Sequence, residues 1–360
     1  MTSTTTTYEG DDVLDAAIAQ ELEAEPSGVT SGWRRFAYAV LANRSLTITI
    51  AGMAVFVFFS LTTRQFLTAN NLLNLVRNMS LIGIVAVGMT YLLVAGEIDL
   101  SVGSVYGVLT VIIGLLVSTL HLDPWLAMLA AIALGAAIGT LNGTIVTRLG
   151  IPSFIVTLAA LTAYRSAALV VSGQKPSVTQ GEGVFYTLTG GSIGPVPWLI
   201  VWLALVGVIG GVVLSTTKFG YHVYATGGNL EAARNSGIDT ARVKVVCFAL
   251  TGGLCGMVAG LLWGYLHTAA PVTGTGFEFR VIGAVIIGGV LLSGGRGTIY
   301  GSLVGAMIIG MITSGLVLLG LSQDIGDVAT GLLIVVVGAF DLIARRTATR
   351  GLILIGGSRE

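Results

Sequence analysis

The sequence predicts an all-α integral membrane protein with about ten transmembrane helices and both termini in the cytoplasm. Of its 360 residues, 54% are hydrophobic and only 10% are charged, whereas about 25% of the residues in a soluble chain are charged. The mean hydropathy is +0.90. Apolar runs near the ~20 residues that a spanning helix needs recur along the chain. A lipid bilayer is therefore the expected surrounding.

The apolar runs follow one another with short polar connections. They cover residues 45–62, 72–95, 101–120, 125–147, 152–172, 196–215, 243–266, 278–293, 298–320 and 327–343. The eighth is the weakest, because its strongly apolar part, Val281 to Leu292, has only 12 residues. Such a segment is either a re-entrant half-helix or a span that the preceding residues complete.

Basic residues set the expected orientation, because cytoplasmic loops are enriched in Lys and Arg. With ten crossings from an internal N-terminus, 13 of the 18 basic residues lie inside. They are Arg34, Arg35, Arg44, Arg148, Lys218, Arg234, Arg242, Lys244, Arg296, Arg345, Arg346, Arg350 and Arg359. Without the eighth crossing, Arg345, Arg346 and Arg350 would be exported, so we keep all ten.

Polar tails flank the expected transmembrane domain, which covers residues 33–346. Residues 1–32 carry seven acids and no Lys or Arg, unlike a secretory signal. They are expected to form an acidic, disordered cytoplasmic tail, with a weak helix over residues 12–25 as the alternative. Residues 347–360 form a second cytoplasmic tail.

Glycine recurs at every fourth position in three of the apolar runs. The positions are Gly135, Gly139 and Gly143; Gly252, Gly256, Gly260 and Gly264; and Gly297, Gly301 and Gly305. This spacing places the glycines along one stripe of a helix, where helix backbones approach closely in lipid. A densely packed bundle is expected.

The residue patterns of an enzyme are absent from the sequence. There is no P-loop and no HExxH metal motif, so we expect no catalytic residue, no metal and no cofactor on this chain. The net charge is zero, which gives no reason to expect a nucleic acid partner. Arg165 is the one charge that lies deep in a predicted span, so a proton-coupled carrier with a buried acid is not indicated.

A short helix is predicted in the connection formed by residues 216–242, on the cytoplasmic side. Asn229 is a suitable N-cap, Glu231 and Arg234 complement the helix dipole at its two ends, and Gly237 is a suitable left-handed stop. So short a helix is marginal in water, which indicates that it docks against a partner. The alternative is a capped turn that only joins two spans.

Four motifs resemble the permeases of ATP-binding-cassette importers, in the branch for ribose, xylose, arabinose and galactose. GGNLEAARNSGI at 227–238 is similar to the coupling loop of such permeases, and AGEIDLSVG at 95–103 is similar to a signature of the branch. IPSFIVTLA at 151–159 and GGVLLSGGRG at 288–297 extend the resemblance over residues 45–343.

The resemblance implies an assembly in the cytoplasmic membrane of a prokaryote. Two permease subunits, expected here as a homodimer, bind two ATPase subunits that carry the ATP and Mg, and an extracytoplasmic binding protein delivers the sugar. The expected ATPase contact consists of Asn229, Glu231, Ala232, Ala233, Arg234 and Gly237.

Two further groups of residues are candidates for parts of the transport path. Glu97, Asp99 and Ser101 lie at a predicted cytoplasmic turn, where they would brace the inner gate or the ATPase surface; alternatively, Asp99 or Ser101 simply caps the third span. Pathway candidates are the polar residues on apolar runs, which alternatively form interhelical hydrogen bonds. These are Asn74, Asn78, Asn142, Thr157 and Thr162.

The resemblance favours a pentose, since Glu97 and the IPSFIVTLA motif are closest to xylose permeases; polyols, inositol and hexoses stay open. One stretch departs from the family: EFRVIG, with Arg280, stands where ELDAIA is expected. The main alternative function is an ATP-independent carrier or facilitator for small polar solutes. Many such carriers have two similar halves, but no internal sequence repeat is evident here.

Overall fold

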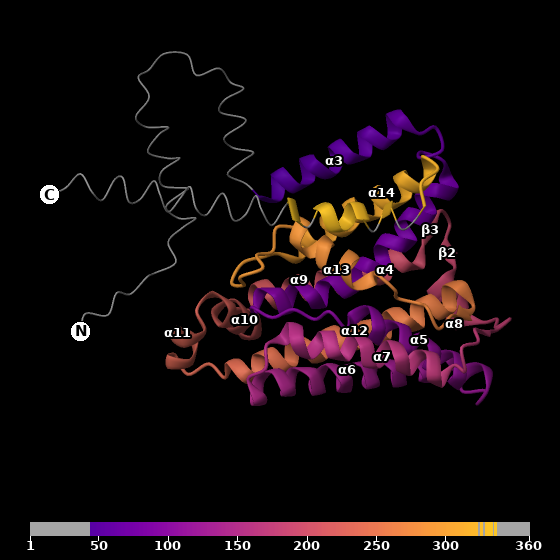
Figure 1. Cartoon of the computed structure of the whole chain (residues 1–360). Coiled ribbons are helices and arrows are strands. Elements are labelled where there is room, and N and C mark those ends of the chain that lie inside the picture. The colour runs from indigo at the N-terminus through magenta and orange to yellow at the C-terminus, as the bar shows by residue number, and fades with distance from the viewer. Residues whose placement is uncertain (1–43, 323–324, 327, 334, 337–360) are drawn as a thin grey trace, which may run out of the picture.

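The computed structural model describes residues 44–322, 325–326, 328–333 and 335–336 (Figure 1). The helices are α3 (Arg44–Thr62), α4 (Ala69–Val94), α5 (Val102–Ser118), α6 (Pro124–Leu149), α7 (Ser153–Val171), α8 (Val184–Gly190), α9 (Trp198–Thr216), α10 (Lys218–Gly228), α11 (Leu230–Asn235), α12 (Thr240–Leu266), α13 (Phe277–Ile287) and α14 (Ile299–Leu318). The strands are β1 (Ser177–Val178), β2 (Ser192–Ile193), β3 (Val196–Pro197) and β4 (Thr268–Ala269).

The helices form a membrane bundle. Among the described residues, six helices are long and apolar enough to span a bilayer, namely α4, α6, α7, α9, α12 and α14. Two shorter apolar helices, Leu46–Thr62 within α3 and Val102–Ser118, accompany them. The acidic tail of residues 1–32 and the C-terminal tail of 347–360 lie outside the described residues, as does part of the expected tenth span.

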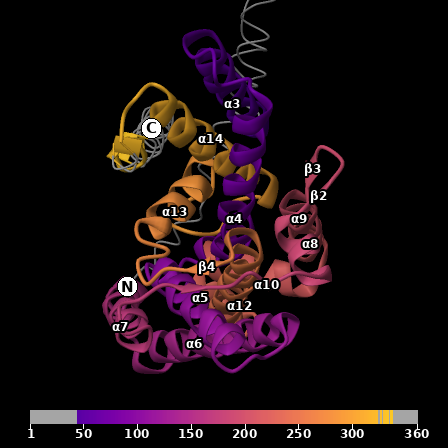
Figure 2. The same cartoon turned by 90° about the vertical axis from the view of Figure 1, so that its right-hand side faces the viewer.

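Helices α4 and α12 form the centre of the bundle. In each of them, 61% of the most apolar 18-residue window is buried within the protein, against 17% in α7. Figure 2 shows α13 and α14 on one side of the centre, beside α4, and α6 on the other side, beside α12. Helix α3 packs on α14, and α7 packs on α5 and α6.

The predicted glycine stripes of α6 and α12 form contacts between these helices, as do Gly301 and Gly305 of α14, whereas Gly297 lies in the loop before α14 and not on its stripe. A Cβ atom on Gly252 would overlap the carbonyl group of Gly135, and one on Gly256 would overlap the carbonyl of Ala131, so α12 and α6 pack backbone to backbone. In the same way, Gly305 of α14 lies against the carbonyl of Ala284 in α13. Larger side chains would separate these helices, as expected for association in lipid.

The two ends of the bundle differ in structure. Helices α10 and α11 lie at one end, called the α11 end here, and α8 with the strands lies at the other, the α8 end (Figure 1). At the α8 end, β1 pairs antiparallel with β4, and β2 pairs with β3.

Two helices begin in the middle of the bundle instead of at an end. The carbonyl oxygen of Val102, the first residue of α5, accepts a hydrogen bond from Cys255 in the middle of α12, whereas Glu97 pairs with Lys244 near the start of α12. The non-helical residues 95–101 therefore lead from the α11 end to the interior, where α5 starts.

Helix α13 begins beside the start of α5 and runs in the opposite direction. The chain after β4 follows α5 inward, because Ala269 contacts Gly114, Thr273 contacts Gly107, and Gly274 contacts Gly103. Helix α13 then continues to the α11 end, where Gly295 lies against Val94. Figure 1 shows α5 toward the α8 end and α13 toward the α11 end.

The continuous helix expected over residues 278–293 is therefore a half-helix of 11 residues. It ends at Ile287 because Gly288 and Gly289 follow, the latter with φ +83°, a conformation that stops a helix. The non-helical residues 270–276 precede this half-helix and lie along α5.

Candidate functional site

Helix α11 is the short helix predicted in the connection between two spans. The Asn229 side chain accepts a hydrogen bond from the Ala232 amide at 3.0 Å, Glu231 lies in the first turn and Arg234 in the last. Gly237, with φ +83°, follows the helix. The predicted cap and stop are confirmed, because the signals that specify them are local in sequence.

The faces of α11 differ in exposure. Ala233 is buried against the protein, whereas Glu231, Ala232 and Arg234 are exposed. The Arg234 Nε donates to the Thr240 hydroxyl at 3.1 Å, which ties α11 to the first residue of α12. The outer face is therefore a small, charged surface on a helix that is anchored to a central span.

Five glycines join α11 to the core through backbone contacts. A Cβ atom on Gly227 would overlap the Val94 carbonyl, and Gly294 and Gly295, both with positive φ, lie against Gly96 and Gly228. The Gly295 amide donates to the Val94 carbonyl at 2.8 Å. We call Gly96, Gly227, Gly228, Gly294 and Gly295 the glycine junction. It connects α4, α10 and the loop after α13.

A tyrosine holds the same loop from α10. The Tyr224 hydroxyl donates to the Gly297 carbonyl at 2.7 Å. Burial raises the pKa of this phenol above its ordinary value, so the hydroxyl keeps the proton that it donates.

Glu97, Asp99 and Ser101 lie in the non-helical stretch before α5. Glu97 forms an ion pair with Lys244 of α12 at 2.5 Å, and both side chains are largely buried. The Asp99 carboxylate accepts from the Ser101 amide at 2.7 Å and from its hydroxyl at 2.6 Å. Ser101 occupies the N-cap position of α5, as one alternative expected, but its side chain accepts no hydrogen bond from the helix; it donates to Asp99 instead, and the two side chains fix the turn.

A cavity of about 520 Å³ lies in the half of the bundle toward the α8 end. This volume is within the range of about 300–1,000 Å³ that is typical of small-molecule sites. The first half of α4, the last half of α14, residues 272–275 and the start of α13 surround it. Its polar side chains are Asn71, Asn74, Asn78, Thr275, Arg280, Thr313 and Ser314.

Several of these polar groups are available to a ligand. Asn71 is engaged, since its Oδ1 accepts from the Ser314 hydroxyl at 2.8 Å and its Nδ2 donates to the Phe66 carbonyl. Asn74 and Asn78 are exposed and form no side-chain hydrogen bond with the described part of the chain. Thr313 Oγ1 is buried and has no partner there.

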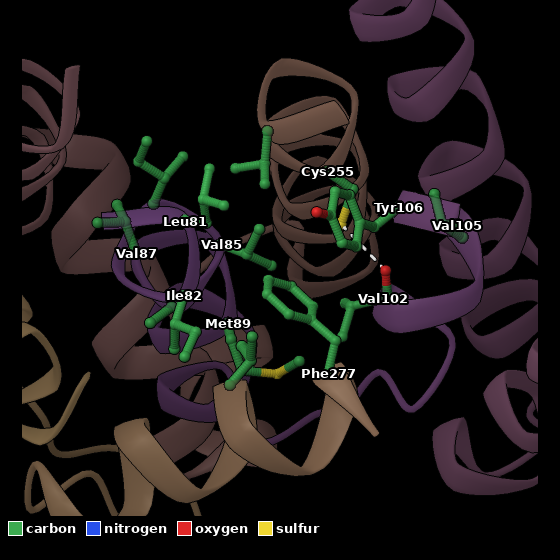
Figure 3. Close-up of a cluster of buried hydrophobic side chains, with 14 of the residues drawn as sticks. Leu81, Ile82, Val85, Val87, Met89, Val102, Val105, Tyr106, Cys255 and Phe277 are labelled. Carbon is green, nitrogen blue, oxygen red and sulfur yellow. Dashed lines mark hydrogen bonds between the residues drawn. The ribbon is translucent and has the colours of Figure 1, made fainter. Parts of the chain in front are cut away.

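Two aromatic rings close the inner end of the cavity. The rings of Tyr106 from α5 and Phe277 from α13 lie 4.8 Å apart between centroids. Figure 3 shows them facing each other beside Val85, with Met89 next to Phe277 and Cys255 behind Tyr106. The starts of both half-helices therefore form the inner wall of the cavity.

Only two of the five pathway candidates line the cavity in the structure. Asn74 and Asn78 line the cavity. Asn142 is buried and donates to the Ser101 hydroxyl at 3.2 Å, a bond between α6 and the stretch before α5. Thr157 and Thr162 bond to carbonyls in their own helix.

Sequence reasoning missed several cavity residues. Asn71 carries a recognisable signal, because Asn71, Asn74 and Asn78 lie three and four residues apart and so on one helix face. Tyr106 and Phe277, which close the inner end of the cavity, have no comparable spacing in the sequence, because they meet only through the tertiary fold. No group of three His, Cys, Asp or Glu residues that would hold a metal occurs in the described part of the chain.

Comparison with known proteins identifies the family. Residues 71–338 match the family described as "Branched-chain amino acid transport system / permease component". The chain is 37% identical to the ribose import permease protein of Bacillus subtilis (strain 168), over 79% of this chain and 88% of that protein.

Two other relatives are similarly close. The L-arabinose ABC transporter permease protein of Azospirillum brasilense is 37% identical over 78% of this chain and 81% of its own length. The autoinducer 2 import system permease protein of Salmonella typhi is 32% identical over 83% and 86%. No solved structure matches the chain significantly. The chain belongs to this family of non-catalytic membrane permease subunits, in the branch that contains ABC sugar importers.

Proposed function

We propose that this chain is the permease subunit of an ATP-driven importer that carries a monosaccharide, with a pentose favoured. The observation that carries the proposal is α11: a capped helix with an exposed charged face, anchored through Thr240 and the glycine junction to the two central helices. A helix of 6 residues is not stable by itself, and its outer face is open to a partner. That partner is a separate ATPase that carries ATP and Mg.

The α11 end faces the cytoplasm in this proposal. The basic residues Arg148, Lys218, Arg234, Arg242, Lys244 and Arg296 lie in or beside the elements at that end. This distribution supports the orientation under the positive-inside rule, with ten crossings and both termini in the cytoplasm. Glu97, paired with Lys244, is then part of the inner gate.

The cavity at the α8 end then opens outward, toward an extracytoplasmic binding protein. The amides of Asn74 and Asn78 and the Thr313 hydroxyl, which have no hydrogen-bond partner within the described residues, offer neutral donors and acceptors suited to sugar hydroxyls. Ribose and L-arabinose occur in the names of two relatives, which supports a pentose. Resemblance in the motifs keeps xylose as the first sugar to test.

The permease works as a dimer, by analogy with the importer class, and ATP binding on the partner moves α11. This movement reaches the gate through the ion pair of Lys244 with Glu97 and through the glycine junction. The ribose and arabinose permeases among the relatives favour this energised mechanism over an ATP-independent facilitator.

Gentle extraction from native membranes followed by mass spectrometry tests the proposal. We expect a P-loop ATPase to co-purify in stoichiometric amount, and ATP to drive pentose uptake in liposomes. A chain that runs alone and still moves solute in liposomes is a facilitator, and this result would refute the proposal.

A charge reversal locates the contact. Glu231→Lys is expected to reduce ATP-driven uptake by more than about tenfold, because a reversed charge in an interface costs over ~1.4 kcal/mol, while the chain stays in the membrane. Glu182→Lys, an equal change at an exposed residue toward the α8 end, leaves the ATPase bound. Unchanged uptake by Glu231→Lys contradicts the assignment of α11.

A further inference from the structure

Arg165 of α7 lies against the non-helical stretch that precedes α13. Its guanidinium donates to the Thr275 hydroxyl at 2.7 Å and to the carbonyls of Gly274 at 3.0 Å and Thr273 at 3.1 Å, and it approaches the Val272 carbonyl at 3.5 Å. One side chain thus binds four consecutive residues that are more than 100 positions away in the sequence.

Both partners need this contact. Non-helical backbone at membrane depth leaves carbonyls that lipid cannot satisfy, and a cation there is costly unless it is paired. The planar fork of an arginine presents several donors at once, which a lysine cannot do. The charge and the irregular backbone therefore stabilise each other.

The backbone that Arg165 holds is also a wall of the cavity. Val272, Gly274 and Thr275 line the cavity on one side, while α5 packs behind them, with Gly107 against Thr273 and Gly103 against Gly274. Arg165 itself does not line the cavity. It acts on the cavity only through the wall.

The same stretch sets the position of α13. Phe277, which closes the inner end, and Glu278, which is buried against Gly103, follow directly after it. The Oε2 atom of Glu278 has no hydrogen-bond partner in the described part of the chain, and Arg165 is one of two cations that act on this carboxyl electrostatically. The guanidinium therefore acts on both the stretch and the first turn of the helix that follows it.

We propose that Arg165 is a positioning residue that fixes the wall formed by residues 272–275, and with it the start of α13, so that the cavity accepts the substrate. This role rests on the proposed function for its transport readout, but its geometric part is independent of it. The contact predicts that loss of the guanidinium frees the wall without unfolding the bundle.

Thiol labelling measures the wall directly. The only cysteines, Cys247 and Cys255, are buried, so a cysteine at the exposed cavity residue Val272 is the main reactive thiol. In a Val272→Cys chain, Arg165→Met is expected to raise the labelling rate by a membrane-impermeant reagent at least about fivefold, and Arg165→Lys by less, because a point-like ammonium replaces only part of the fork.

Two controls isolate the effect. Arg64→Met removes an exposed cation from the loop between α3 and α4 and should leave labelling at Val272→Cys unchanged. Asn78→Cys, on the α4 wall of the cavity, should label at the same rate with and without the Arg165→Met substitution. An unchanged rate at Val272→Cys, or an equal rise at both sites, overturns the proposal, since the second result indicates general loosening.

Transport provides the second readout. In liposomes with the ATPase, Arg165→Met should lower uptake by at least about tenfold while the ATPase still co-purifies and basal ATP hydrolysis persists, with partial recovery in Arg165→Lys. Normal uptake by Arg165→Met contradicts the role in transport. If the wild-type assembly shows no ATP-driven uptake, the proposed function fails instead, and the labelling result still decides whether Arg165 positions the wall.

Discussion

The half-helices α5 and α13 both begin inside the bundle, but different contacts hold the stretches that precede them. Before α5, short polar side chains bond locally, as in Asp99 with Ser101, and the ion pair of Glu97 ties the stretch to α12. Before α13, one arginine binds successive carbonyls, and the opposite side of the stretch faces the cavity.

This difference indicates a division of roles. The stretch before α5 has buried partners from α6, α7 and α12, including Asn142 and Ser153, so it moves only with the central helices. The stretch before α13 depends on Arg165 and has a free side. We infer that the first stretch transmits movement from the α11 end and that the second, held by Arg165, keeps the cavity wall in place.

The largest effect on uptake is expected from a substitution where the half-helices α5 and α13 touch. A methyl group at Gly103 would overlap the Glu278 carboxylate and lie 2.6 Å from the Gly274 carbonyl. Gly103→Ala is expected to abolish uptake and to lower stability by about 1–3 kcal/mol, as measured by thermal unfolding of the purified chain. Gly211→Ala in α9, where the nearest atom is 4.0 Å away, is the matched control; equal behaviour of the two variants would show that the contact is not needed.

A smaller effect is expected from the ion pair that ties the stretch before α5 to α12. Reversing only Glu97 or only Lys244 leaves two like charges side by side in a largely buried place, which is unfavourable, so each single variant should lower uptake in part and uncouple some of the ATP hydrolysis from it. The combined Glu97→Lys and Lys244→Glu exchange should recover most of the coupling. Failure of the exchange to recover it would indicate that the pair does not act as a unit.

The smallest effect is expected at Asn142, whose amide donates to Ser101. Asn142→Leu should lower stability by about 1 kcal/mol, measured by thermal unfolding, and should leave uptake near the wild-type rate, because the stretch keeps its other partners. Thr157→Val, which removes a bond within one helix, is the comparison. A loss of transport in Asn142→Leu would place this asparagine in the transport path itself.

Local signals explain what could be predicted from the sequence. The cap at Asn229, the stop at Gly237 and the glycine stripes of α6 and α12 depend on neighbours within a turn or two, so their spacing is visible in the chain. Asn74 and Asn78 were recognisable as polar residues on an apolar run, and both line the cavity.

The features that could not be predicted from the sequence depend on long-range contacts. Lys244 and Glu97 are 147 residues apart, and neither residue carries a sign of its partner. The non-helical stretch before α13 was not predicted, since an apolar run of 12 residues does not show where the helix itself begins. Ser101 does occupy the N-cap position of α5, but its side chain bonds to Asp99 instead of the helix, which the sequence did not reveal.

The sequence by itself determined that this protein lies in a membrane, where its helices approach one another closely, and that it carries a short capped helix outside the spans. Hydrophobicity, glycine spacing and capping are properties of single segments. Only the tertiary structure decided that two spans break in the interior, that Arg165 holds one of the breaks, and that a cavity forms beside it. These features depend on backbone groups that lose their helical partners and find new ones on distant segments, since lipid offers none.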